Sequence, residues 1–345
     1  MNKMRKRDFV KLFVWVSILL VSCNNSDDDL KEKKQSNTIE FSKAPVSLGG
    51  VDLKYAENIA YDVYPETVFD ILLPQVERPT ALVVFIHGGG FTSGDKNFIY
   101  KEQLINDVKE LLQNNIAVAT LNYRLLTENE EEGVLKCLND SKRALQFIRY
   151  KADELNVDKE NILLYGVSAG AGTSLWLATN DDMRNPESTD FVSRESTRVK
   201  GIALKEMQCS YDIERRWIED VFEDYNLQWG EFLVENKETL FRFYGVDSEE
   251  EYESAQIDEY RKKIDMLMLL SSDDPEVWAS NTQTIVSEPV NTAIAYHHAF
   301  HVRELKEYAD AVGVMNVCYY GKDPIIYSDS SNESYVDFFI RKANE

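Results

Sequence analysis

Apolar residues in the middle of the chain gather in short continuous blocks. These blocks lie at residues 82–86, 116–121, 162–165 and 199–204. Apolar blocks of this length predict strands that are covered on both faces. The stretches between them, at 102–113 and 138–153, hold apolar residues at helical spacing. This alternation predicts an α/β fold in which helices cover both faces of a mostly parallel central sheet.

The same kinds of pattern continue on both sides of this central part. Further predicted strands lie at 60–64, 68–73, 276–280 and 314–320, and further predicted helices at 299–311 and 335–343. Gly313 stands where the first of these helices is expected to stop.

Residues 211–263 have a different character, because no strand pattern occurs there. Aromatic residues alternate with acids at helical spacing, namely Trp217, Phe222, Tyr225, Trp229, Phe232, Phe241, Phe243 and Tyr244. An insertion at this point in the order would lie over the carboxyl edge of the sheet, so we predict a helical cap. The aromatic side chains either line a pocket for an acyl or aryl group or pack the cap onto the body, which is their commoner use.

The first residues predict an export signal rather than part of the fold. A basic start precedes an apolar run at 12–21 and the tetrad Leu20-Val21-Ser22-Cys23. This resembles a bacterial lipoprotein signal, which implies removal of residues 1–22 and lipidation of Cys23. An uncleaved anchor is the alternative, although the apolar run is short for a membrane span.

The segment after Cys23 is polar and highly charged, so we predict a flexible tether over 23–43 and a folded domain over 44–345. Its acidic cluster, Asp27-Asp28-Asp29, resembles signals that send lipoproteins of some Gram-negative groups to the cell surface. We therefore expect a protein held outside the cytoplasm by a lipid anchor, at the outer membrane or cell surface.

Charge limits the possible partners. The chain has 38 basic and 60 acidic residues, a formal net charge of -22. Such a surface repels nucleic acid and anionic headgroups, so we expect no nucleic-acid partner and membrane contact only through the anchor. Apart from Cys23, the cysteines are Cys137, Cys209 and Cys318. Their spacing matches neither a disulfide framework nor a zinc site, although it does not exclude one disulfide between two of them.

Two glycine motifs follow predicted strands. Gly166-Val167-Ser168-Ala169-Gly170 comes between the block 162–165 and a helix-like stretch. A strand, sharp turn and helix in this order expose a serine hydroxyl as a nucleophile. His87-Gly88-Gly89-Gly90 follows the block 82–86 and has backbone N–H groups that can turn toward an oxyanion.

Together with Asp70 to Pro74, Gly94-Asp95 and Asn122-Tyr123-Arg124, these motifs resemble α/β-hydrolases of the carboxylesterase and lipase branch, including bacterial acetyl and feruloyl esterases. The resemblance is strong over residues 61–172. It implies that Ser168 is the nucleophile and that N–H groups of Gly88 or Gly89 and of Ala169 form the oxyanion hole. It also implies that Tyr123 and Arg124 brace the surrounding loops.

The histidine that should activate Ser168 is out of place. The resemblance implies a histidine in the loop after the last strand, but residues 321–327 contain none. The chain has four histidines, His87, His297, His298 and His301.

The base is therefore expected between the last two predicted strands. Our first choice is His298 and our second is His301, because neighbouring residues point to different sides and the helical phase is not determined by the sequence. Glu288, Asp273 or Asp274 would orient the ring.

Two other interpretations of this cluster stay open. His297 and His301 are four residues apart and could hold a metal from one helical face, but no third ligand is evident. The histidines could also be structural. We expect His87 to brace the glycine turn rather than act as a base, and we expect no cofactor or metal.

The sequence thus indicates a serine-dependent hydrolase of carboxylic esters that forms an acyl-enzyme on Ser168. Its substrates would be small or polysaccharide-linked esters. The alternative is a catalytically degenerate hydrolase fold that serves as a binding protein. This alternative is serious because loss of the base costs a serine hydrolase about a millionfold in turnover.

Overall fold

The computed structural model describes residues 39–225, 227–282, 288–289 and 292–345. The signal peptide, Cys23 and most of the predicted tether lie outside these residues. The described part of the chain begins at Ile39, within the segment predicted as tether. Ser42 of this segment donates a backbone hydrogen bond of 2.7 Å to Tyr55 in the folded domain. Within the described part, no helix is both long enough and apolar enough to cross a membrane.

Nine strands of the described chain form one sheet in the order β1-β2-β4-β3-β5-β6-β7-β8-β9. Their bounds are β1 Leu53–Ala60, β2 Val68–Pro74, β3 Thr80–Ile86, β4 Ala117–Leu121, β5 Val157–Val167, β6 Gly201–Lys205, β7 Glu276–Asn281, β8 Asn316–Tyr320 and β9 Tyr327–Ser328. The strands from β4 to β8 pair in parallel, whereas β1, β2 and β9 pair antiparallel at the two edges. The prediction of a mostly parallel sheet is confirmed.

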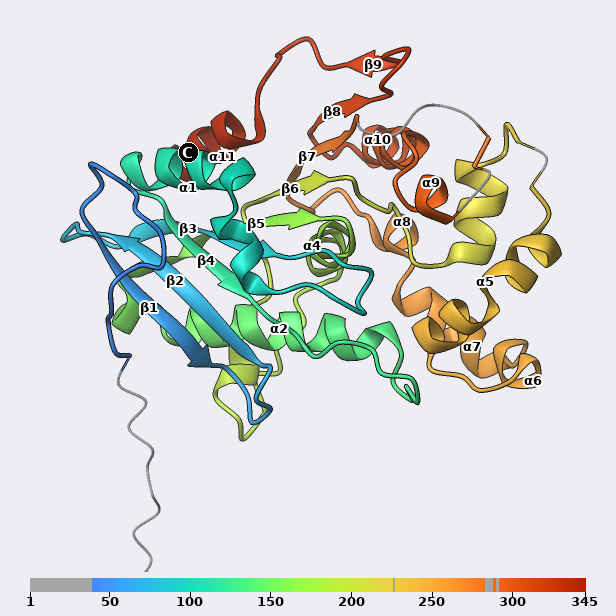
Figure 1. Ribbon diagram of the computed structural model, residues 1–345, viewed down its shortest axis with the longest axis horizontal. Helices are drawn as coiled ribbons and strands as arrows, with labels where there is room; N and C mark the ends of the chain where they lie inside the picture. Colours follow the sequence, from blue (N-terminus) through green and yellow to red (C-terminus); the bar gives the residue numbers. More distant parts are fainter. Residues whose placement is uncertain (1–38, 226, 283–287, 290–291) are drawn as a thin grey trace, which may run out of the picture. The chain divides into compact units, whose positions relative to one another are not determined.

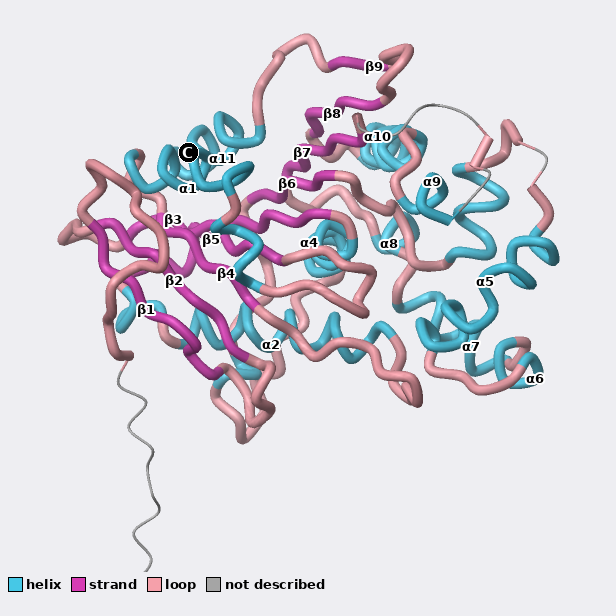
Figure 2. Tube along the Cα trace, in the orientation of Figure 1, coloured by secondary structure: helices cyan, strands magenta, loops and turns pink. Residues whose placement is uncertain are grey.

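Helices cover both faces of the sheet (Figure 2). The main ones on the body are α1 Glu102–Gln113, α2 Val134–Tyr150, α3 Ala152–Leu155, α4 Ala169–Thr179, α10 Phe300–Val312 and α11 Tyr335–Asn344. Strand β3 shows why both faces are covered. Its residues Leu82, Val84 and Ile86 pack in one apolar cluster with α2, α4 and α10, while Val83 and Phe85 pack in another with α1 and α11.

Both edges of the sheet differ from the prediction, and only the last residue of β1 Leu53–Ala60 was predicted as strand. Residues 61–64, predicted as strand, form the turn between β1 and β2, where Thr67 donates a backbone hydrogen bond to Tyr64. Pro65 favours this turn because it has no N–H to donate to a sheet. The short edge strand β9 was not predicted, since two residues give no periodic pattern.

The region between β6 and β7 is helical. It contains η3 Ile213–Val221, a π-helix, followed by α5 Trp229–Tyr244, α6 Glu249–Tyr252, α7 Ala255–Lys263 and α8 Met266–Leu269. Figure 1 shows these helices in yellow and orange beyond the carboxyl ends of the parallel strands. The short elements η1 Lys96–Tyr100, η2 Val192–Arg194 and α9 Thr292–Tyr296 complete the described helices.

Candidate active site

Ser168 stands at the sharp turn between β5 and α4. Its φ of 54° lies in the left-handed region, which is strained for a residue with a side chain. The flanking glycines make the turn possible, because a Cβ on Gly166 would lie 2.2 Å from the Gly170 carbonyl oxygen and one on Gly170 2.0 Å from that of Ile86. The turn places the Ser168 side chain at the carboxyl edge of the sheet.

His297 faces this serine. Its Nε2 lies 2.9 Å from Ser168 Oγ, within hydrogen-bond distance. The residue stands between α9 and α10, in the long connection that follows β7. Burial lowers the pKa of His297 below its usual 6.5, so the ring is neutral at neutral pH and Nε2 can accept the serine proton.

The two histidines favoured from the sequence lie elsewhere, and this corrects the expectation. His298 is fully buried, its Nδ1 accepts a hydrogen bond of 3.2 Å from the Phe300 N–H, and its ring packs edge-on against Phe222. The physical reason is the phase of the chain at the start of α10, which turns His298 toward the cap and its neighbour His297 toward the serine.

His301 is also fully buried and away from Ser168. Its Nε2 donates to the Ala295 carbonyl oxygen at 2.9 Å, and its Nδ1 lies 3.4 Å from Cys209 Sγ. Burial lowers the pKa of His301 to about 3. Both ring nitrogens of His301 therefore face protein atoms rather than a position shared with His297. Among the described residues, no cluster of three or more His, Cys, Asp or Glu could hold a metal ion.

The acids proposed to orient the base do not reach it. Asp273 and Asp274 precede β7 and pair with Arg198, at the opposite end of that strand from Ser168. Glu288 is exposed. Within the residues that the structure covers, no carboxylate forms a hydrogen bond with His297.

Two side-chain amides instead hold the backbone on either side of His297. Gln208 Nε2 donates to the Tyr296 carbonyl oxygen at 2.7 Å, and Asn281 Nδ2 donates to that of His298 at 3.0 Å. Asn281 also forms two hydrogen bonds with the backbone of Met207, of 2.8 and 3.0 Å. The histidine segment is thereby tied to the loop after β6.

Sequence reasoning missed both amides. The available signal was their position, because Asn281 ends β7 and Gln208 follows β6 by three residues, at the edge where sites of such sheets lie.

The glycine run lies directly against the serine turn. A Cβ on Gly88 would be 2.7 Å from the Val167 carbonyl oxygen and 3.0 Å from Ser168 Cβ. Gly89 has a φ of 110°, and its carbonyl oxygen accepts the N–H groups of Thr92 and Ser93 at 3.1 Å. This tight turn requires glycine, since a Cβ on Gly89 would overlap Ser93.

Ala169 begins α4, so its N–H has no partner within the helix. Gly89, Ser168 and Ala169 all line the same cavity. An oxyanion formed at Ser168 would therefore lie beside free backbone donors and the positive end of the helix dipole.

His87 holds this loop in place, as the sequence indicates. Its ring stacks on Tyr123 with a centroid distance of 4.5 Å, and its Nδ1 lies 2.7 Å from the Gly88 carbonyl oxygen. The Tyr123 hydroxyl donates to the His87 carbonyl oxygen at 3.0 Å. Burial lowers the pKa of His87, so the ring is neutral. Arg124 forms a two-pronged ion pair with Asp140 that anchors the same segment to α2.

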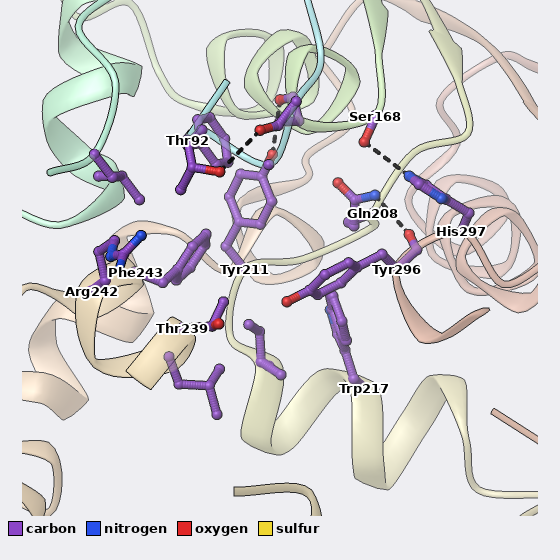
Figure 3. A pocket seen from close by; sticks show the side chains of 17 residues that line it. Thr92, Ser168, Gln208, Tyr211, Trp217, Thr239, Arg242, Phe243, Tyr296 and His297 are labelled. Atoms are coloured by element: carbon purple, nitrogen blue, oxygen red, sulfur yellow. Dashed lines mark hydrogen bonds between the residues drawn. The ribbon is translucent and has the colours of Figure 1, made fainter. Parts of the chain in front are cut away.

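A cavity of about 450 Å³ opens in front of Ser168 and His297 (Figure 3). Its walls are mainly apolar and come from both body and cap, and they include the aromatic residues Phe91, Tyr211, Trp217, Phe243 and Tyr296. The cap aromatics thus serve both predicted uses, because Trp217 and Phe243 line the cavity while Phe222 and Tyr244 are buried in the core. The three cysteines of the described chain are buried and form no disulfide.

Comparison with known sequences finds partial similarity. Residues 69–207 match the BD-FAE family. A secreted lipase of Arthroderma benhamiae is 29% identical over 108 residues, which cover 28% of this chain and 21% of the lipase. Acetylcholinesterase-1 of Trittame loki is 30% identical over 116 residues, 31% of this chain and 20% of that protein. The chain spans about a fifth of the length of these curated relatives.

Comparison with solved structures extends over most of the chain. A truncated form of a carbohydrate esterase from gut microbiota superposes with a TM-score of 0.59 at 14% identity, covering 90% of this chain and 99% of that one. The protein has the α/β-hydrolase fold. A bifunctional GH43-CE protein of Bacteroides eggerthii agrees with this, with a TM-score of 0.57 at 18% identity over 84% of this chain and 38% of its own.

Within this fold, His297 reaches Ser168 from a point in the chain that the sequence resemblance does not predict. The resemblance predicts it after β8, but the loop there, residues 321–326, does not line the cavity. His297 comes from the preceding connection, where the family pattern places the acid.

Proposed function

We propose that the protein hydrolyses carboxylic esters through an acyl-enzyme on Ser168. The observation that carries the proposal is the 2.9 Å contact between Ser168 Oγ and His297 Nε2 at the mouth of an aromatic cavity. A serine needs a neutral base to remove its proton, and burial keeps His297 neutral.

The reaction follows from this arrangement. Ser168 Oγ attacks the ester carbonyl carbon while His297 Nε2 takes the hydroxyl proton. The negative charge moves to the carbonyl oxygen, where the N–H groups of Ala169 and of Gly88 or Gly89 receive it. His297 then gives its proton to the leaving alcohol. In the second half, His297 takes a proton from water, the hydroxide attacks the acyl-enzyme, and Ser168 regains its proton as the acid leaves.

We propose that His297 works without a hydrogen-bonded carboxylate. The usual acid fixes the orientation of the ring and stabilises its protonated form. Here the amides of Gln208 and Asn281 supply the first of these roles by fixing the backbone around His297. Among the residues that the structure describes, no carboxylate fills the second role, so we expect turnover below that of a full triad.

The substrate is proposed to be an ester with an apolar or aryl portion, because the cavity wall is mainly apolar and includes five aromatic rings. An ester linked to a carbohydrate is consistent with the matched proteins that are described as carbohydrate esterases. Lipidation of Cys23 would hold the enzyme at the outer membrane or cell surface. Incorporation of an alkyne-labelled fatty acid into the expressed chain, lost in Cys23→Ala, would support the lipid anchor.

A fluorophosphonate probe tests the catalytic proposal on the full chain. We expect the protein to be labelled, Ser168→Ala to lose the label, and Ser330→Ala, which removes an exposed hydroxyl, to keep it. His297→Ala should slow labelling by at least about 10³-fold, because the serine is then unassisted. Absence of labelling in a folded wild-type protein would refute the proposal and favour a binding protein with a degenerate site.

A further inference from the structure

One charged side chain stands among the described residues that line the cavity, Arg242 of α5. The chain has 60 acidic and 38 basic residues, and most arginines in its described part have an acidic partner. Within the cap, Arg216 pairs with Asp265 and Arg261 pairs with Glu214. The Arg242 side chain forms neither an ion pair nor a hydrogen bond with any residue in the described part of the chain.

The side chain is not simply solvated. Its Nε is buried without a partner, and the residue as a whole is half-buried. Figure 3 shows Arg242 beside Phe243 and across the cavity from Ser168 and His297. A partly buried guanidinium that lacks an acceptor is unfavourable, and the usual acceptor is a carboxylate, which matches its planar pair of donors.

A second polar group lies on the same wall. Thr239 precedes Arg242 by three residues on α5, so the two share one helical face, and both line the cavity. The Thr239 hydroxyl can donate a hydrogen bond to the same carboxylate that the Arg242 guanidinium would bind. The rest of the cavity wall is mainly apolar, with aromatic and aliphatic side chains, and suits an apolar spacer.

We infer that Arg242 and Thr239 form a subsite for a carboxylate carried by the ester substrate. This inference rests on the proposed function and narrows it to acidic esters. The subsite binds the carboxylate unchanged while Ser168 attacks the ester at the other end of the cavity. Because the net charge of -22 repels anions, selectivity for an acidic ester depends on this local cation.

The test compares charged and neutral esters of the same shape. One pair, mono-4-nitrophenyl adipate and its methyl ester, places the carboxylate on the acyl portion. The other, 4-carboxyphenyl butyrate and its methyl ester, places it on the alcohol portion. For each pair the measured quantity is the ratio of kcat/KM for the charged ester to that for the neutral ester. Comparing this ratio between wild type and variant cancels differences in intrinsic reactivity.

We expect Arg242→Met to lower this ratio about 10- to 100-fold for at least one pair, the range set by a hydrogen bond to a charged group. Arg242→Lys should retain part of the preference, because it keeps the charge but not the planar fork. Lys237→Met is the matched control, since it removes one positive charge from an exposed position of the same helix. Its ratio should stay within about threefold of wild type.

Equal ratios in wild type and Arg242→Met for both pairs would overturn the inference. A parallel binding measurement separates this failure from failure of the proposed function. In Ser168→Ala, calorimetric titration with monomethyl adipate should show binding that Arg242→Met weakens. Such binding without turnover of any ester in wild type would retain the subsite and reject the esterase. Turnover of esters by wild type, together with monomethyl adipate binding that Arg242→Met leaves unchanged, would retain the esterase and reject the subsite.

Discussion

Gln208 offers the sharpest test of how His297 is held. Its Nε2 donates to the Tyr296 carbonyl oxygen at 2.7 Å and, more weakly, to that of Glu206 at 3.3 Å. The side chain is only 5% exposed, so water does not readily replace it. Gln208→Met keeps the length of the side chain and removes the donor.

The expected loss follows from these contacts. Leaving a buried carbonyl oxygen without its donor costs about 1–3 kcal/mol, which the segment relieves by moving. A shift of about 1 Å would take the Ser168–His297 contact from 2.9 Å beyond hydrogen-bond range. Misplacement of this size costs about 10²-fold in rate, so we expect kcat to fall about 10- to 100-fold.

The assay is a double-mutant cycle on ester hydrolysis and on the rate of fluorophosphonate labelling. If Gln208 acts through His297, then Gln208→Met should cost nothing further once His297→Ala is present. Gln208→Glu, which has the same shape but turns an acceptor toward the Tyr296 carbonyl oxygen, should lose at least as much as Gln208→Met. Activity within about threefold of wild type in both Gln208 variants would refute the reasoning.

Three further predictions concern the same region. Because burial lowers the pKa of His297 below 6.5, the acid limb of kcat/KM should have its midpoint below pH 6.5; a pH–rate profile with that midpoint above 6.5 would contradict this. Gly88→Ala should lower kcat about 10²- to 10³-fold, because the new Cβ would meet the Val167 carbonyl oxygen at 2.7 Å, whereas Gly49→Ala, with no atom within 4 Å, should not. His301 has a pKa of about 3 when folded and about 6.5 when unfolded, so the unfolded state binds more protons between these values and stability falls as pH drops from 6.5 toward 3. A pKa difference of one between the two states corresponds to ~1.4 kcal/mol. The free energy of unfolding, measured in urea between pH 4 and 7, should therefore depend less on pH in His301→Leu than in wild type.

The parts that the sequence determines by itself depend on local rules. The block 82–86 became β3, and the helical spacing at 102–113 became α1 with the same bounds, because a buried strand and an amphipathic helix each have a fixed period. The elbow around Ser168 was evident for the same reason. Only glycine fits at positions 166 and 170 of so tight a turn, so the two glycines make the turn recognisable in the sequence.

Tertiary structure alone decided which histidine meets the serine. His297, His298 and His301 are chemically alike, and which of them faces Ser168 depends on how α10 rotates as it packs against the cap. The hydrogen bond from Gln208 to Tyr296 joins residues 88 positions apart. Its acceptor is a backbone carbonyl oxygen, which every residue carries. No pattern of side chains in the sequence can therefore predict this hydrogen bond. Long-range packing determined the rotation of the histidine segment, the hydrogen bonds of Gln208 and Asn281 that hold this segment, and the cavity. These features complete the site that the two glycine motifs begin.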